Sequence, residues 1–134
     1  MSKLAPLKVF ITGASSGIGA ALAQHYAALG ATLGLAARRA AQMQTLAASL
    51  PTQVSVYALD VADSAALAAA ARDFILRHGV PDIVIANAGI SAGTRADLAA
   101  DIAVLSDILR TNVVGLAATL QPFVAPMRER GSGV

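Results

Sequence analysis

Three glycines near the start of the chain have a spacing that is suited to binding phosphate. They lie in the segment TGASSGIG, residues 12–19, between the apolar run at residues 9–11 and an amphipathic stretch that begins at Ile18. This order predicts a strand, a tight turn and a helix. Glycine lets the backbone approach a ligand closely, and the free N–H groups of a helix N-terminus bind a pyrophosphate. The segment therefore predicts a cradle for a pyrophosphate.

The glycine spacing separates this turn from two other phosphate-binding loops. Gly13, Gly17 and Gly19 form G-x-x-x-G-x-G, whereas most dinucleotide folds carry G-x-G-x-x-G. A Walker loop does not fit, because Ile18 stands where its second glycine would fall and no lysine follows. The alternative interpretation is a glycine-rich turn between a strand and a helix, without a ligand.

Three further short motifs follow the glycine turn. Asp60-Val61 comes after the run at residues 54–59, Asn87-Ala88-Gly89 comes after residues 83–86, and Asn112 lies in the segment TNVVG. Together with TGxxxGIG, in this order, they resemble the short-chain dehydrogenase/reductase family. The resemblance implies the cofactor-binding part of an oxidoreductase that moves hydride between a nicotinamide and a carbonyl or alcohol.

The residues that the resemblance implies for catalysis are missing. The family uses a Tyr with a Lys four residues later, and a Ser upstream of both. No Tyr-x-x-x-Lys occurs here, and the only lysines, Lys3 and Lys8, precede the glycine turn. The sequence ends where the resemblance places a fifth strand. We therefore expect residues 1–134 to form a single NADP-binding half-domain, truncated before the catalytic segment and inactive by itself.

Apolar runs alternate with segments of helical period, which predicts an α/β fold. The second and fourth runs are almost entirely apolar, as expected for strands with helices on both faces. Right-handed crossovers then give a doubly wound, Rossmann-like parallel sheet of order 3-2-1-4, truncated after the fourth strand and its helix. The expected strands are residues 7–12, 32–36, 54–59 and 83–86, and the expected helices are residues 18–29, 40–50, 64–78 and 98–129.

The helices carry signals for their ends and for their buried faces. Asp63 is the expected N-cap of the third helix. Pro122 and Pro126 predict a kink or a break in the last one, because proline lacks an N–H and clashes with the preceding turn. The predicted buried stripes are Ile18, Leu22, Tyr26 and Leu29 on the first helix, and Leu67, Ala70, Ala71, Phe74 and Ile75 on the third.

The candidate ligand-binding residues lie after the strands, whose carboxyl ends meet where the strand order reverses. An NAD site has an acid after the second strand, but here Ala37 is followed by Arg38 and Arg39. Two guanidiniums favour the 2′-phosphate of NADP(H), with NAD(H) the less favoured cofactor. A solvated basic start of the second helix is the alternative. The predicted cofactor-binding residues are Gly13, Ser15, Ser16, Gly17, Ile18, Gly19, Arg38, Arg39, Asp60, Val61, Asn87, Ala88 and Gly89.

Three of the polar residues also have interpretations without a ligand. The resemblance implies that Asp60 accepts a hydrogen bond from the adenine amino group, while the alternative is a tether for its own loop. It implies that Asn87 braces the sheet beside the cofactor, while the alternative is a plain turn. Asn112 stands at the family's proton-relay position, but its partners are absent, so a relic or a structural kink is expected.

Composition argues against nucleic-acid binding, a membrane span and a metal site. The net charge is only +2, and basic residues are too sparse for nucleic-acid binding. No uninterrupted apolar run reaches the roughly 18 residues of a membrane span, and the N-terminus lacks a long apolar leader, so we expect a cytoplasmic protein. Cysteine is absent, and His25 and His78 are not expected to bind metal. A sheet that ends at its fourth strand leaves that edge open beside an apolar face, so we expect either self-association through this edge or its adjoining helices, or a chain cleaved from a longer one.

Two other functions remain open. The chain could be a dinucleotide-binding module that works without catalysis at this length. It could also belong to another doubly wound class, such as the methyltransferases, although Thr12 and the Asn-Ala-Gly motif disfavour this.

Overall fold

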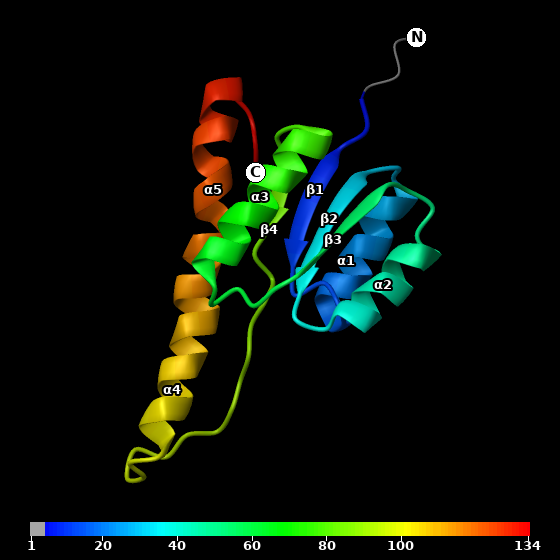
Figure 1. Ribbon diagram of the computed structural model, residues 1–134. Helices are drawn as coiled ribbons and strands as arrows, with labels where there is room; N and C mark the ends of the chain where they lie inside the picture. Colours follow the sequence, from blue (N-terminus) through cyan, green and yellow to red (C-terminus); the bar gives the residue numbers. More distant parts are fainter. Residues whose placement is uncertain (1–4) are drawn as a thin grey trace.

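The four predicted strands form one parallel sheet in the order β3-β2-β1-β4 (Figure 1). The structure is a computed structural model that describes residues 5–134. The predicted α/β class and strand order are confirmed. The elements in chain order are β1 (Lys8–Thr12), α1 (Gly17–Ala28), β2 (Thr32–Ala37), α2 (Ala40–Ser49), β3 (Val54–Ala58), α3 (Ser64–His78), β4 (Ile83–Ile85), α4 (Asp101–Leu109), the π-helical turn η1 (Arg110–Val114) and α5 (Gly115–Arg130).

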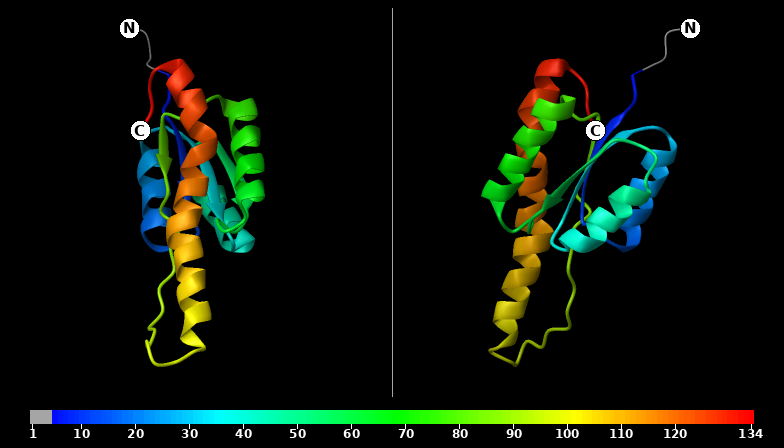
Figure 2. Two further views of the ribbon diagram at one scale, coloured as in Figure 1. Left: turned by 90° about the vertical axis from the view of Figure 1, so that its left-hand side faces the viewer. Right: turned by 45° about the vertical axis from the view of Figure 1, so that its right-hand side comes forward.

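The sheet separates two apolar cores, because successive side chains of a strand point to opposite faces. On β1, Val9 and Ile11 face the layer of α1 and α2, whereas Phe10 faces α3 and α5. Figure 2 shows the two helix layers on either side of the sheet. The ring of Phe10 lies 5.6 Å from that of Phe74 and 5.0 Å from that of Phe123, so it links both helices of its layer.

Helix α1 packs on the sheet through small residues. Its buried positions are Gly19, Ala23 and Ala27, while Ile18 is 73% exposed and Leu29 is 63% exposed. The predicted stripe was therefore wrong at both of its ends. The small residues recur at every fourth position, which lets the helix backbone approach the sheet closely. On α3, in contrast, the predicted face is confirmed, with four of its five residues buried and the fifth packed against the same core.

The last helical segment is interrupted at a different place from the one predicted. Helix α5 runs through Pro122 and Pro126, and the irregular turn is η1, ahead of both prolines. Each proline removes one backbone hydrogen bond, but Thr119 and Phe123 on the same helix are buried and hold it against the α3 layer. The expected break at the prolines was therefore wrong, and a kink there stays a prediction.

The end of the chain pairs with the outer edge of β4. The Val84 N–H donates to the Val134 carbonyl at 2.9 Å, and the Val134 N–H donates to the Asp82 carbonyl at 2.9 Å. The guanidinium of Arg130 donates to the Val80 carbonyl at 2.6 Å and to the neighbouring Pro81 carbonyl at 2.7 Å. This edge was expected to be open, but part of it is covered by the chain itself.

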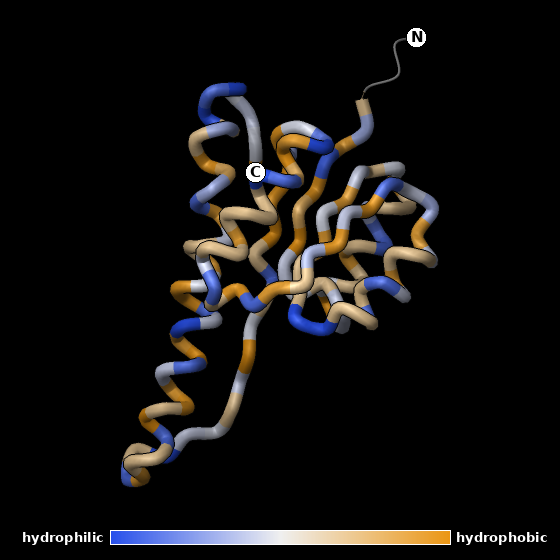
Figure 3. The backbone as a smooth tube through the Cα atoms, in the orientation of Figure 1, coloured by the Kyte–Doolittle hydropathy of each residue, from blue (hydrophilic) through white to orange (hydrophobic). Residues whose placement is uncertain are grey.

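The rod formed by α4, η1 and α5 extends beyond the sheet (Figure 1), and apolar residues recur along it (Figure 3). By length and composition, Asp101–Arg130 is apolar enough to cross a membrane, and 11% of its most apolar window is buried. One such helix is weak evidence for a membrane protein, so the absence of a membrane partner stays a prediction. The exposed large apolar residues of the rod are Ile102, Leu105, Leu109, Val113, Val114, Leu116 and Val124.

Candidate functional site

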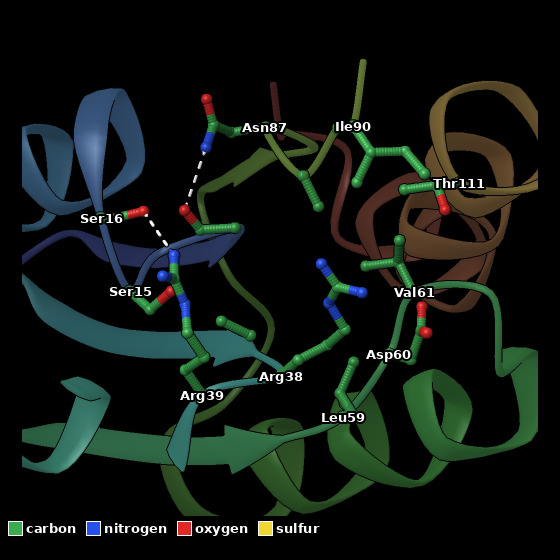
Figure 4. Close-up of a pocket in the computed structure, with 14 residues that line it drawn as sticks. Ser15, Ser16, Arg38, Arg39, Leu59, Asp60, Val61, Asn87, Ile90 and Thr111 are labelled. Atoms are coloured by element: carbon green, nitrogen blue, oxygen red, sulfur yellow. Dashed lines mark hydrogen bonds between the residues drawn. The ribbon is translucent and has the colours of Figure 1, made fainter. Parts of the chain in front are cut away.

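A cavity of about 210 Å³ opens at the carboxyl ends of the four strands (Figure 4). Ten of the thirteen predicted cofactor-binding residues line it. The other three, Gly17, Ile18 and Gly19, begin α1 and do not line the cavity. The lining residues are Gly13, Ser15, Ser16, Ala37, Arg38, Arg39, Leu59, Asp60, Val61, Asn87, Ala88, Gly89, Ile90 and Thr111.

The glycine turn lies directly against the loop after β4. Gly13 has a φ of +66°, and a Cβ on it would lie 2.8 Å from the Cα of Ala88. The amide of Asn87 donates to the Gly13 carbonyl at 3.2 Å, and the Ala88 N–H donates to the Thr12 hydroxyl at 3.2 Å. Asn87 therefore braces the turn against the sheet, in addition to its place in the cavity wall.

The two later glycines of the motif serve different purposes. Gly17 has a φ of +56°, which disfavours any other residue, and no atom lies within 4 Å of the position its Cβ would take. The backbone is therefore uncovered at the start of α1. Gly19 is buried, and a Cβ there would lie 2.7 Å from the side-chain nitrogen of Asn87. Its lack of a side chain allows the helix to pack against the turn.

The N-terminus of α1 has no side-chain cap. The N-cap residue Ser16 makes no hydrogen bond to the first amides of the helix, and its hydroxyl instead accepts from Nη2 of Arg39 at 2.8 Å. Helix α3 differs, because the Asp63 carboxylate accepts from the Ala66 N–H at 3.0 Å, as the sequence predicted. Uncapped amides and the helix dipole together favour an anion at the start of α1.

The two arginines after β2 lie in different directions. In Figure 4, Arg39 reaches the glycine turn at Ser16, whereas the guanidinium of Arg38 lies among the lining residues on the side of Val61. The carboxylate of Asp60 accepts from the Ala62 N–H at 2.9 Å, so it tethers its own loop. The alternative interpretation of Asp60 is therefore observed, and a contact with adenine stays a prediction.

Asn112 fastens the π-helical turn to the loop after β4. Its Oδ1 accepts from the Ile90 N–H at 2.8 Å, and its Nδ2 donates to the Ile90 carbonyl at 2.8 Å. A π-helical turn inside a longer helix often marks a functional position. The expectation of a structural kink fits this geometry, and the two bonds hold Ile90 and Thr111 in the cavity wall.

A family model described as short chain dehydrogenase matches residues 7–134. The chain belongs to the short-chain dehydrogenase family. Among curated relatives, the probable oxidoreductase EphD of Mycobacterium tuberculosis is 36% identical over 129 residues, which cover 93% of this chain and 22% of that protein.

Solved structures that are similar to this chain have the same fold. A short-chain dehydrogenase from Streptomyces avermitilis matches with a TM-score of 0.87 and 33% identity, over 96% of this chain and 47% of that one. The L-sorbose reductase of Gluconobacter frateurii, solved in complex with NADPH and L-sorbose, matches with a TM-score of 0.85 and 29% identity, over 97% of this chain and 51% of that one. The chain thus spans about half the length of these two solved structures and less of the curated relative.

Sequence analysis missed four of the residues that line the cavity. Ala37 directly follows the second predicted strand, and Leu59 ends the third. Ile90 and Thr111 directly adjoin the Asn-Ala-Gly motif and Asn112. Each of the four is the chain neighbour of a residue singled out from the sequence, so extending each motif by one residue would have identified them.

The titratable groups with shifted pKa values lie outside the cavity, between β3 and α3. Burial, together with a 2.8 Å hydrogen bond to Asp73, raises the pKa of the Tyr57 hydroxyl to about 12. The same hydrogen bond lowers the pKa of Asp73, and burial lowers that of His78, whose Nε2 lies 2.8 Å from the Ser55 hydroxyl. No group of three metal-ligating side chains occurs within residues 5–134. The hydrogen bonds Tyr57–Asp73 and Ser55–His78 thus form a polar cluster that joins β3 to α3.

Proposed function

We propose that this chain is the NADP(H)-binding half of a short-chain oxidoreductase. The observation that carries the proposal is Arg38, directly after β2, in a cavity wall that also includes Arg39 and the glycine turn. Ala37 stands where an NAD site has an acid, so no carboxylate at that position would repel a 2′-phosphate. The complex of the related L-sorbose reductase with NADPH supports the same choice.

The residues present fit the parts of such a cofactor. The uncapped start of α1 and the uncovered backbone at Gly17 would hold the pyrophosphate. Arg38 would bind the 2′-phosphate, and Asp60 with the backbone of Val61 would contact the adenine. When bound, the nicotinamide supplies hydride exchange with a carbonyl or an alcohol.

We propose that the intact protein performs this hydride exchange and that the 134-residue chain does not. Hydride transfer to a carbonyl requires a proton donor, and the chain contains no Tyr-x-x-x-Lys to supply one. We expect purified chain to oxidise no NADPH with any carbonyl substrate. NADPH turnover by the purified chain, freed of host reductases, would refute this. A second candidate function is a dinucleotide-binding module without catalysis, for which no turnover is expected either.

Calorimetric titration with NADPH and NADH tests the cofactor proposal. Arg38→Asp should invert the preference, because it removes a charged contact to the 2′-phosphate and places an acid beside the ribose. A charged hydrogen bond contributes about 1.5–3 kcal/mol, so we expect the NADPH affinity to fall roughly 10- to 100-fold. Arg72→Asp on α3 is the matched control, since Arg72 is exposed and does not line the cavity. If the ratio of NADPH affinity to NADH affinity is unchanged, Arg38 is a solvated surface residue and does not bind the 2′-phosphate.

We further propose that the chain self-associates through the exposed apolar side of α4 and α5. Seven large apolar side chains of this rod are exposed, an extent that favours contact with another protein surface. Light scattering with intact-mass measurement tests this, and a stable monomer of 13.4 kDa that binds NADPH tightly would contradict it and favour the module. A cytoplasmic location stays a prediction.

A further inference from the structure

The two adjacent arginines after β2 are held by different parts of the chain. Nη2 of Arg39 donates to the hydroxyl of Ser16 at 2.8 Å, although the two residues are 23 positions apart in the sequence. Arg38 lines the cavity, and its guanidinium lies on the other side, toward Val61 (Figure 4). Arg39 therefore contacts the glycine turn, whereas Arg38 extends into the space that a ligand would enter.

Ser16 stands at a capping position but makes no capping hydrogen bond. Ser16 is the N-cap of α1 and has the extended backbone of a capping residue, with φ −159° and ψ 171°. Serine at this position ordinarily accepts a hydrogen bond from the second or third amide of the helix. Here it does not, while Asp63 caps α3 in the usual way. In α1 the Ser16 hydroxyl instead accepts from Arg39.

We propose that Arg39 is a positioning residue that holds the Ser16 hydroxyl off the first amides of α1, so that these amides remain free for a pyrophosphate. Arg38 alone then discriminates for the 2′-phosphate. The inference rests on the proposed dinucleotide function. It divides the two arginines by the part of the ligand on which each acts, one on the group that NADP and NAD share and the other on the group that only NADP has.

This division makes the variants distinguishable. In Arg39→Ala, the Ser16 hydroxyl is free to cap α1 and competes with the pyrophosphate. A serine cap is worth a factor of about five, so NADPH and NADH should both bind about fivefold more weakly, with their ratio unchanged. Arg38→Ala should lower NADPH affinity and leave NADH nearly unaffected. Both arginines are exposed, so neither change disturbs the core.

The decisive measurement is rescue by a second substitution. Ser16→Ala in the Arg39→Ala background removes the competing hydroxyl, so the double variant should regain most of the lost affinity for both dinucleotides. Ser16→Ala alone measures what the hydroxyl itself contributes to the binding of each dinucleotide. Calorimetric titration of the four proteins completes a double-mutant cycle, in which the two substitutions are expected to be strongly non-additive. Far-ultraviolet circular dichroism confirms that each variant is folded.

Three results would overturn the inference. If Arg39→Ala changes the NADPH-to-NADH ratio, Arg39 is itself a ligand of the 2′-phosphate. If the double variant binds more weakly than Arg39→Ala, or as weakly, the hydroxyl does not compete for the helix amides. If the unmodified chain binds neither dinucleotide, the proposed function fails together with the inference, whereas an Arg38-dependent ratio without rescue sinks the inference alone.

Discussion

Replacing Gly19 by alanine tests whether close packing of α1 against the glycine turn holds this end of the sheet together. The added Cβ would meet the backbone of Gly13, with its carbonyl carbon at 2.8 Å, and the side-chain nitrogen of Asn87 at 2.7 Å. Both distances are shorter than real Cβ contacts. The backbone cannot swing aside as a flexible side chain would, so the helix or the turn must shift.

Two opposing effects set the size of the change. Alanine is a better helix former than glycine by roughly 1 kcal/mol, which by itself would stabilise the chain. Overpacking a tight contact costs about 1–3 kcal/mol, and the upper part of this range applies because the neighbour is backbone and the Asn87–Gly13 hydrogen bond is also displaced. We therefore expect Gly19→Ala to lower the free energy of unfolding by roughly 1–2 kcal/mol.

Urea unfolding followed by circular dichroism measures this difference directly. Gly93→Ala is the matched control, because no atom lies within 4 Å of its Cβ position and it lies in an exposed loop. Its free energy of unfolding should change by no more than about 0.5 kcal/mol. A Gly19→Ala chain as stable as the unmodified one, or more stable, would show that the turn and helix have room to spare and would refute the packing argument.

Three more outcomes follow from contacts described above. Asn112→Ala leaves the N–H and carbonyl of Ile90 without their partners, so the free energy of unfolding should fall by about 1–3 kcal/mol and the Ile90 amide should exchange faster with deuterated solvent. The Tyr57 hydroxyl should ionise near pH 12 in an absorbance titration, and this step should be absent in Tyr57→Phe. Because folding raises the pKa of Tyr57, its contribution to the free energy of unfolding is complete below about pH 10 and is lost as the pH rises toward 12. Asp63→Ala should cost about 1 kcal/mol of stability, whereas Ser16→Ala in the unliganded chain should cost less, because only the first of the two residues caps its helix.

Much of the fold follows from local sequence signals. The strands were predicted within one residue at either end, since apolar runs flanked by glycine and polar residues have few other structures available to them. Asp63 was identified as a cap for the same local reason. The candidate site was also largely predictable, because a parallel sheet brings the residues that follow its strands together at one edge.

The errors arise where packing over distance decides the outcome. Periodicity selects the largest apolar residues of α1, but the sheet accepts Gly19, Ala23 and Ala27, because a close approach of backbones excludes bulk. Ile18 then faces solvent beside the glycine turn. Likewise, the pairing of Arg39 with Ser16 joins residues whose nearness depends on the register between β1 and β2, which no local pattern contains.

The π-helical turn η1 changes which side of the rod the residues of α5 occupy, relative to those of α4. It holds one more residue than an α-helical turn, and successive residues of an α-helix are about 100° apart, so α5 is rotated by about a quarter turn against the face that α4 would otherwise continue. On a regular helix, Leu109 and Leu120 would lie on one side, eleven positions apart. Here Leu120 packs on the core beneath the sheet while Leu109 remains 49% exposed. Deleting a single residue between 110 and 114 should therefore turn the exposed apolar face of α4 by about a quarter turn relative to α5 and move Asn112 relative to Ile90, so that the apolar rod and the cavity wall would change together.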